Sequence, residues 1–334
     1  MAVLSPTQAN VPFDPEIFLA LSQEYSTEKN LLVTSGALAF DQELYNIAMA
    51  NAGKITRASW LYDFKDADYW DGQHDTEVDS IGHKEQTSVI VRKYKIWGWN
   101  ELTKYMSRGK TPEVAINDEV QNHKDTSLKR CMLSMLKGIF ANTTVAGKLV
   151  YDISKKSMTS ADYIKAKTKF WGDMMNSASL IIMHSIPYAN LLTKLTETQM
   201  VNFLQGAQIL VDDSITAGTG NTYETYILRN GAIRWTGDLP LRNTGVFYEN
   251  NQQKNQGEEY VGYRRAFLFE PVGLSFKGTL TKPITAQNSE LEVGTNWEMV
   301  LEPKKVGIGI IKSKEVLEDT AITQSADSEK ATGR

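Results

Sequence analysis

The chain has little cysteine and little histidine. Its 334 residues include one cysteine, Cys131, so no disulfide can form within the chain. Cys131 lies on the apolar face of a helical pattern, and we expect a buried structural thiol rather than a nucleophile. The four histidines show no zinc-ligand spacing. We therefore expect no disulfide framework, no metal centre and no cofactor.

Long apolar runs and an excess of positive charge are also missing. No run of about 18 apolar residues is present, so we expect no membrane-spanning helix and no membrane partner. The first 15 residues lack the basic and apolar parts of a signal peptide. The formal net charge is −4, which argues against tight nucleic-acid binding by the chain as a whole. The length allows two domains of ordinary size.

One long helix is predicted over residues 111–141. Thr111 suits the N-cap, and Pro112 follows at a position where its missing N–H costs nothing. Apolar residues recur at helical spacing only from Leu128 to Phe140. The first half, residues 117–127, is polar apart from Val120. We expect this half to run along a surface or along a neighbouring subunit.

Residues 54–95 predict two strands joined by a long acidic loop. The stretch from Asp63 to Asp79 holds seven carboxylates against Lys65, and five aromatic residues are interleaved with them or just precede them: Trp60, Tyr62, Phe64, Tyr69 and Trp70. A compact domain rarely has so long a connection without a function.

A calcium site in this loop fits poorly. If Asp66 is position 1 of an EF-hand loop, Asp68 and Glu77 fit positions 3 and 12. Asp71 and Gly72, however, fall one place late, and no helical pattern flanks the loop. A solvated or inter-subunit loop is therefore the favoured interpretation.

The rest of the chain predicts a mixture of helices and strands. We expect a short helix over residues 36–53 ended by Gly53, and a plain connection over 143–158. Further expected elements are an amphipathic helix with the apolar face Tyr163, Ile164, Phe170 and Met174, buried strands at 179–185 and 207–215, a helix over 187–195, and a hairpin over 223–237 turning at Asn230-Gly231. Together they predict a small α/β domain.

One cluster could carry enzyme chemistry. His184 and Ser185 follow one predicted strand, and Asp212 and Asp213 follow the next. If the two strands were neighbours, a Ser/His/Asp arrangement would be conceivable. No GxSxG motif is present, and the glycines of AGTGNT (217–222) precede a strand rather than a helix. The favoured interpretation is that His184 caps a strand and the aspartates begin a turn, which leaves no catalytic residue.

Six stretches in the same order carry a family resemblance: QTSVIVRKYKIWGWNEL, SMLKGIFAN, SLIIMHSIPYANLLTK, ILVDDSI with TYETYILRNGAIRW, YRRAFLFEPVGLSFKG, and TNWEMVLEPKKVGIGIIK. They resemble the major capsid proteins of tailed bacteriophages, which have the Hong Kong 97-like fold. The resemblance covers about residues 30–312. It implies an α+β fold with an N-terminal arm (1–53), an extended loop (54–95), a peripheral domain (96–159) with the spine helix 111–141, an axial domain (160–241), returning peripheral strands (242–312) and a polar tail (313–334).

The resemblance also implies a function. The chain would be a non-enzymatic shell protein that forms pentamers and hexamers around double-stranded DNA, assembled in the bacterial cytoplasm and found in the virion. Expected partners are other copies, a separate scaffolding protein, a portal and decoration proteins, with DNA contacted non-specifically. Two alternatives stay open: an encapsulin-type nanocompartment shell, and an α/β enzyme that uses His184, Asp212 and Asp213.

Overall fold

The computed structural model describes residues 31–51, 53–61, 72, 83–99, 112–215, 218, 220–241, 245–251 and 258–316. Within helices and strands a few side chains are also left out, including those of residues 112–125 in the long helix. The expectations for the N-terminal arm before residue 31, for the Thr111 cap and for the acidic loop fall outside this part of the chain, apart from Gly72.

The first of two main sheets has six strands. Its order is β1 (Leu38–Phe40), β8 (Ile233–Trp235), β10 (Glu258–Pro271), β3 (His83–Trp99) and β2 (Lys54–Leu61), and β9 (Gly245–Asn251) pairs with β10. Strands β3 and β10 are antiparallel, from Glu259 opposite Trp99 to Phe269 opposite Val89. Strands β2 and β3 form the long hairpin that the sequence predicts around the acidic loop. A small separate sheet pairs β11 (Leu274–Phe276) with β12 (Trp297–Met299).

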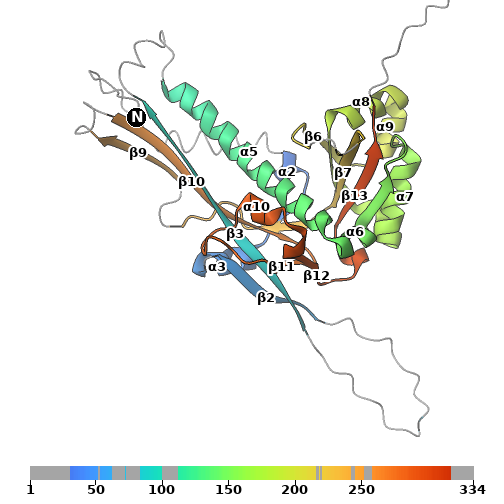
Figure 1. The fold of residues 1–334 in the computed structure, drawn as a ribbon, viewed down its shortest axis with the longest axis horizontal. Coiled ribbons are helices and arrows are strands. Elements are labelled where there is room, and N and C mark those ends of the chain that lie inside the picture. The colour runs from blue at the N-terminus through green and yellow to red at the C-terminus, as the bar shows by residue number, and fades with distance from the viewer. Residues whose placement is uncertain are drawn as a thin grey trace, which may run out of the picture.

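The second main sheet has five strands in the order β4 (Val150–Ile153), β13 (Ile308–Lys314), β7 (Thr222–Arg229), β5 (Ala178–Met183) and β6 (Gln208–Val211). Three helices pack on one face of it: α7 (Ser160–Trp171), α8 (Ser185–Lys194) and α9 (Glu197–Leu204). Figure 1 shows this unit beside the first sheet, at the lower end of the long helix. Sequence reasoning missed α9.

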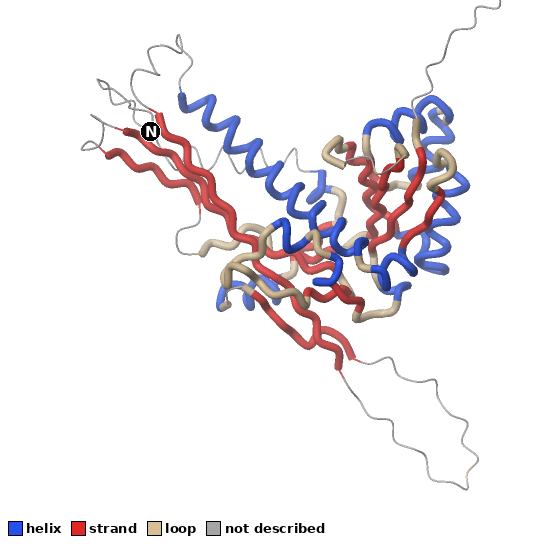
Figure 2. The backbone as a smooth tube through the Cα atoms, in the orientation of Figure 1, coloured by secondary structure: helices blue, strands red, loops and turns tan. Residues whose placement is uncertain are grey.

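The long helix α5 spans Pro112–Ala141, as the sequence predicts. Its predicted apolar face is buried: Leu128, Cys131, Met132, Met135, Leu136, Ile139 and Phe140. These side chains belong to one core cluster that also takes residues from both main sheets, for example Phe267 on β10 and Ile310 on β13. Cys131 is buried as the sequence predicts, and burial raises the pKa of its thiol to about 11. Figure 2 shows α5 running alongside the long strands of the first sheet.

Several local predictions are wrong near the long helix. Residues 36–53 are not one helix: β1 comes first, and α3 (Gln42–Ala50) begins after Asp41, whose carboxylate accepts a hydrogen bond from the Leu44 N–H. The helix ends before Asn51, not at Gly53. Residues 143–158 are not a plain connection, because α6 (Thr143–Leu149) and β4 lie there. Asn142 begins α6 by accepting hydrogen bonds from two backbone N–H groups.

The hairpin predicted over 223–237 is also wrong. The turn itself forms, with the Ala232 N–H donating to the Arg229 carbonyl at 3.1 Å and Gly231 at φ +67°. The flanking strands then separate, because β7 pairs with β5 and β13 while β8 pairs with β1 and β10. Tertiary pairing thus overrides a correct local turn signal.

Other boundaries shift for physical reasons. Helix α7 ends at Trp171, because Gly172 takes φ +55°, and the expected core residues Ile164 and Met174 are exposed. Strand β6 is a half-buried edge strand rather than a buried one. The predicted tail 313–334 begins too early, since β13 runs to Lys314 and Glu315 is buried.

The second sheet does not match the predicted axial segment 160–241. It takes β4 and β13 from outside that segment, and it leaves β8 to the first sheet. Two distant stretches of chain therefore complete it.

We expect Gly138→Ala to destabilise the protein. A methyl group at Gly138 in α5 would overlap the Leu291 carbonyl oxygen and lie 2.9 Å from Trp297 Nε1. In an open helix position the same change would stabilise by about 1 kcal/mol. Gly147 in α6 has no such atom within 4 Å, so Gly147→Ala is the matched control. Thermal unfolding should give a lower midpoint for the first variant only, and equal midpoints would contradict the packing.

Candidate functional site

The structure brings the predicted histidine cluster together. Strands β5 and β6 are parallel neighbours, with Met183 opposite Val211, so the residues after each strand meet at one edge. His184 Nε2 lies 3.7 Å from Asp213 Oδ1, and Ser185 Oγ lies 3.3 Å from His184 Nδ1. The two strands are therefore neighbours, which is the condition under which the sequence made a Ser/His/Asp arrangement conceivable.

The hydrogen bonds of this cluster are those of a helix N-terminus. His184 Nδ1 accepts from the Ile186 N–H at 3.1 Å, which makes His184 the N-cap of α8. Asp213 Oδ1 accepts from the Ser185 N–H at 3.1 Å, and these hydrogen bonds with Ser185 lower the pKa of Asp213. A general base for Ser185 needs a free lone pair, and His184 Nδ1, the ring nitrogen beside Ser185 Oγ, already accepts the capping hydrogen bond of the helix. The geometry therefore fits a capping role, as the sequence favoured, with α8 rather than a strand capped.

Asp212 is engaged with the long helix. Its carboxylate lies 3.1 Å from Lys129 Nζ on α5, and its Oδ1 accepts from the Ser214 N–H at 2.9 Å. Burial would raise the pKa of Asp212, but the hydrogen bonds with Ser214 and the charge of Lys129 together lower it. Asp212 thus links the second sheet to α5.

Metal and phosphate chemistry gain no support from the described residues. They contain no group of three His, Cys, Asp or Glu side chains that could hold a metal ion. The acidic positions Asp66, Asp68, Asp71 and Glu77 lie outside them. Gly218 lies in a short antiparallel bridge before β7, so no helix N-terminus follows it. Among the residues that the structure describes, no helix is both long and apolar enough to span a membrane.

A cleft of about 830 Å³ lies between α5 and the second sheet. Its walls carry charges of both signs, and most are paired across or along the walls. Lys312 Nζ lies 2.9 Å from Glu224, and Lys137 Nζ lies 3.6 Å from Glu292. The cleft therefore presents no concentrated charge of one sign.

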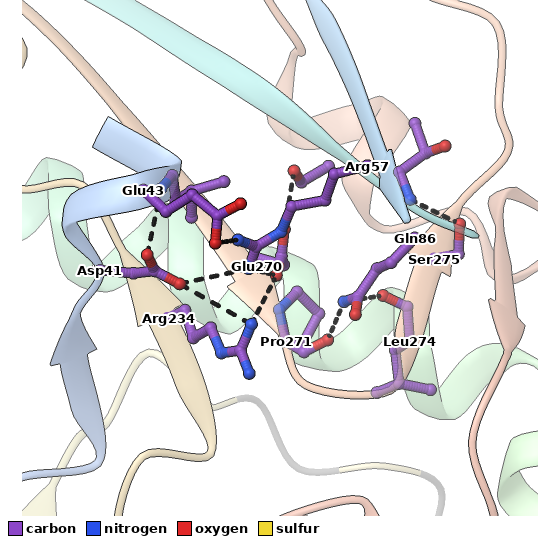
Figure 3. Close-up of polar contacts among 12 residues, drawn as sticks. Asp41, Glu43, Arg57, Gln86, Arg234, Glu270, Pro271, Leu274 and Ser275 are labelled. Atoms are coloured by element: carbon purple, nitrogen blue, oxygen red, sulfur yellow. Dashed lines mark hydrogen bonds and ion pairs between the residues drawn. The ribbon is translucent and has the colours of Figure 1, made fainter. Parts of the chain in front are cut away.

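The base of the long β2–β3 hairpin holds a buried network of charges (Figure 3). Arg57 on β2 reaches across β3 and forms an ion pair with Glu270 on β10, whose side chain is fully buried. Arg57 also lies 3.2 Å from Asp41, the N-cap of α3. Arg234 on β8 lies 3.7 Å from Asp41 and 3.6 Å from Glu270. Two arginines and two carboxylates thus join three strands and a helix.

Two groups of this network, Arg57 and Asp41, have pKa values shifted toward their charged forms. Burial would lower the pKa of Arg57, but its hydrogen bond and ion pair with Glu270 raise it. Burial would raise the pKa of Asp41, but the Leu44 N–H and the charge of Arg57 lower it. The Ser88 hydroxyl lies 3.3 Å from Glu270 and can donate to it.

A second set of hydrogen bonds fixes the same root of the hairpin. Gln86 on β3 is fully buried, and its Nε2 donates to the carbonyls of Pro271 at 2.7 Å and Leu274 at 2.9 Å. The Thr87 N–H donates to Ser275 Oγ at 3.0 Å. Sequence reasoning missed both sets, because their members lie up to 229 positions apart and the alternating pattern gives Gln86 no sign of burial.

We expect Arg57→Met to cost about 3–5 kcal/mol of unfolding free energy, because it removes a main partner of buried Glu270. The double variant Arg57→Met with Glu270→Met should cost less than the sum of the two single variants. Urea unfolding measures all three. Arg130→Met, at an exposed arginine on α5, is the control and should change little. Simple additivity of the two costs would show that the pair is not coupled.

We expect the Asp212–Lys129 link to weaken in acid. The folded state lowers the pKa of Asp212, so its contribution is complete above the unfolded pKa, about 3.9, and is lost as the pH falls through the folded pKa. Asp212→Asn should therefore destabilise at pH 7 and have a much smaller effect near pH 2. Urea unfolding at both pH values tests this, with exposed Asp173→Asn as control. A cost that does not change with pH would contradict the link.

Comparison with known proteins gives one relative in sequence and a likeness in structure. The chain is 23% identical over 314 residues to the major capsid protein of Bacillus phage SPP1. This alignment covers 88% of this chain and 94% of the phage protein. The fold is also similar to that of a chain in the capsid structure of cyanophage Pam1. The superposition covers 81% of this chain and 87% of that chain, with a TM-score of 0.50 and 7% sequence identity. No protein-family model matches.

These findings confirm the resemblance and the fold class expected from the sequence. At 7% identity the structural likeness speaks for the fold alone. The hairpin, the long helix alongside it and the second α/β unit are the elements that the resemblance implied. The chain therefore has the Hong Kong 97-like fold of tailed-phage capsid proteins and is similar, over most of its length, to a bacteriophage major capsid protein.

Proposed function

We propose that this chain is a major capsid protein of a tailed bacteriophage. Its copies would assemble into pentamers and hexamers, and these would form the icosahedral head shell that encloses double-stranded DNA. The observation that carries the proposal is the similarity to the capsid protein of Bacillus phage SPP1, which extends over 94% of that protein. A likeness of this extent covers most of both chains rather than a shared motif.

The arrangement of elements supports a role in assembly. The β2–β3 hairpin is held at its root by the Arg57 network, while residues 62–80 follow its far end. In the proposed shell this acidic segment lies over a neighbouring subunit, and α5 is the spine helix of the peripheral domain. The axial domain is the unit around the second sheet, extended from the predicted 160–241 to include β4 and β13.

A structural rather than enzymatic role also fits the site. His184 and Asp213 are engaged as a helix cap, and Asp212 is engaged with Lys129. The proposed partners are other copies of the chain, with a scaffolding protein, a portal and decoration proteins as further candidates. Assembly would take place in the cytoplasm of the bacterial host, and the mature location would be the virion.

Electron microscopy of the purified full-length protein at high concentration tests the proposal, with light scattering beside it. We expect closed particles, or rings of five and six subunits. We expect Asp66→Lys with Asp68→Lys to give a folded, soluble subunit that does not form shells. The acidic segment would lose its charge complementarity with the neighbouring subunit. The control variant Asp173→Lys with Glu302→Lys makes the same charge change at exposed positions outside the loop and should still form shells.

Two outcomes would count against these statements. Normal shells from the Asp66 and Asp68 variant would refute the role of the loop between subunits. A wild-type subunit that stays monomeric even with its candidate scaffolding protein would refute the shell function. Shells that enclose a protein cargo and no DNA would favour the nanocompartment alternative.

A further inference from the structure

Four exposed lysines gather at the outer edge of the second sheet. Lys165 and Lys169 lie on the exposed side of α7, Lys148 lies in the last turn of α6, and Lys304 lies in the short 3-10 helix Pro303–Lys305. Lys169 Nζ donates to the Val150 carbonyl at 2.7 Å, one residue beyond α6, and the Lys304 side chain lies beside Gly172 at the end of α7. Figure 1 shows α6 and α7 together at this edge. We call these four residues the lysine face.

The lysine face has two exposed acids close to it in the sequence, Asp173 after Gly172 and Glu302 before Lys304, but it forms no ion pair with them. Within the described residues, none of the four has a carboxylate within ion-pair distance, whereas neighbouring Lys156 lies 2.7 Å from Asp162. Lys165 and Lys169 are one helical turn apart, and like charges at this spacing repel each other.

Helix ends explain part of this charge. Lysines in the last turn of a helix interact favourably with its negative end, which accounts for Lys148 in α6 and Lys169 in α7. Lys165 lies in the middle of α7, and Lys304 belongs to another element. Stabilisation of helix ends therefore does not account for the four lysines together, in a chain whose net charge is −4.

We propose that the lysine face contacts the phosphate groups of duplex DNA without reading its sequence. Lysine is a flexible point charge that suits phosphates, and contacts to phosphates alone carry no sequence information. Lys165 and Lys169 are separated by about 6 Å along the helix axis, and the phosphates of one strand repeat about every 3.4 Å, so the two amines can reach different phosphates.

The acidic segment of a second copy is the competing occupant, and the lysine face fits it less well. That segment interleaves its carboxylates with Phe64, Tyr69 and Trp70, and aromatic rings at interfaces need pockets that bury them. The exposed α7 residues next to these lysines are Ile164, which precedes Lys165, and Thr168, which precedes Lys169. The assignment of DNA as the ligand rests on the proposed function, because the proposed shell is what brings DNA to this surface.

Fluorescence anisotropy with a labelled 30-base-pair duplex tests the proposal on full-length unassembled protein across a series of salt concentrations. The logarithm of the binding constant should fall linearly with the logarithm of the salt concentration. The slope should be about 0.9 in magnitude for each phosphate contact. Lys165→Gln with Lys169→Gln should reduce that slope by about 2. Lys277→Gln with Lys282→Gln removes the same charge from exposed positions outside the lysine face and should keep the wild-type slope. Circular dichroism checks that each variant folds.

Two results would overturn the inference: no duplex binding by the wild type at low salt, or equal loss of binding in both double variants. A peptide of residues 60–80 that binds wild type but not Lys165→Gln with Lys169→Gln, without duplex competition, would assign the face to subunit contacts instead. Electron microscopy separates this from the proposed function. Shells without duplex binding refute only the lysine face, and duplex binding by a chain that stays monomeric even with its candidate scaffolding protein refutes only the shell.

Discussion

The buried ion pair between Arg57 and Glu270 is the constraint on which the first sheet depends. Removing two charges from water costs several kcal/mol each, and the cost is recovered only if every partner stays in place. Here the partners come from β2, β10, β8 and the start of α3, so those four elements must be correctly placed at once. The network therefore specifies where the hairpin leaves the sheet.

The charge network fixes the hairpin on the first sheet, and the long helix in turn holds the two sheets together. Its second half buries apolar side chains against strands of both sheets, so the two units share one core instead of meeting at a polar interface. Gly138 shows how close this packing is, because only a residue without a side chain lets α5 approach the Leu291 backbone. The link from Lys129 to Asp212 adds a polar contact at the far edge of the sheet.

Sequence reasoning succeeded where one local signal was enough. The extent of the long helix, the burial of Cys131 and the hairpin strands follow from periodicity and from Pro112 at the first helical position, and the order of family-like stretches predicted the fold. It failed where a distant partner decides the outcome. The turn at Asn230-Gly231 was predicted correctly. The strands on its two sides, however, lie in different sheets, because β8 pairs with β1 and β7 pairs with β13. The sequence left open whether His184 and Asp213 meet, because this depends on how the strands pair. Only the structure shows that they lie together and cap a helix.

The order of strands in the second sheet has a consequence for how the chain is made. Strand β13 lies between β4 and β7, yet it is the last strand of the described residues and ends at Lys314. A ribosome has therefore synthesised β4 and β7 well before the centre of this sheet can be filled, and contacts so distant in sequence form slowly. A nascent chain that stops before Ile308 lacks the strand that completes the sheet and part of the core shared with α5. The second unit thus reaches its final shape only after β13 has been made.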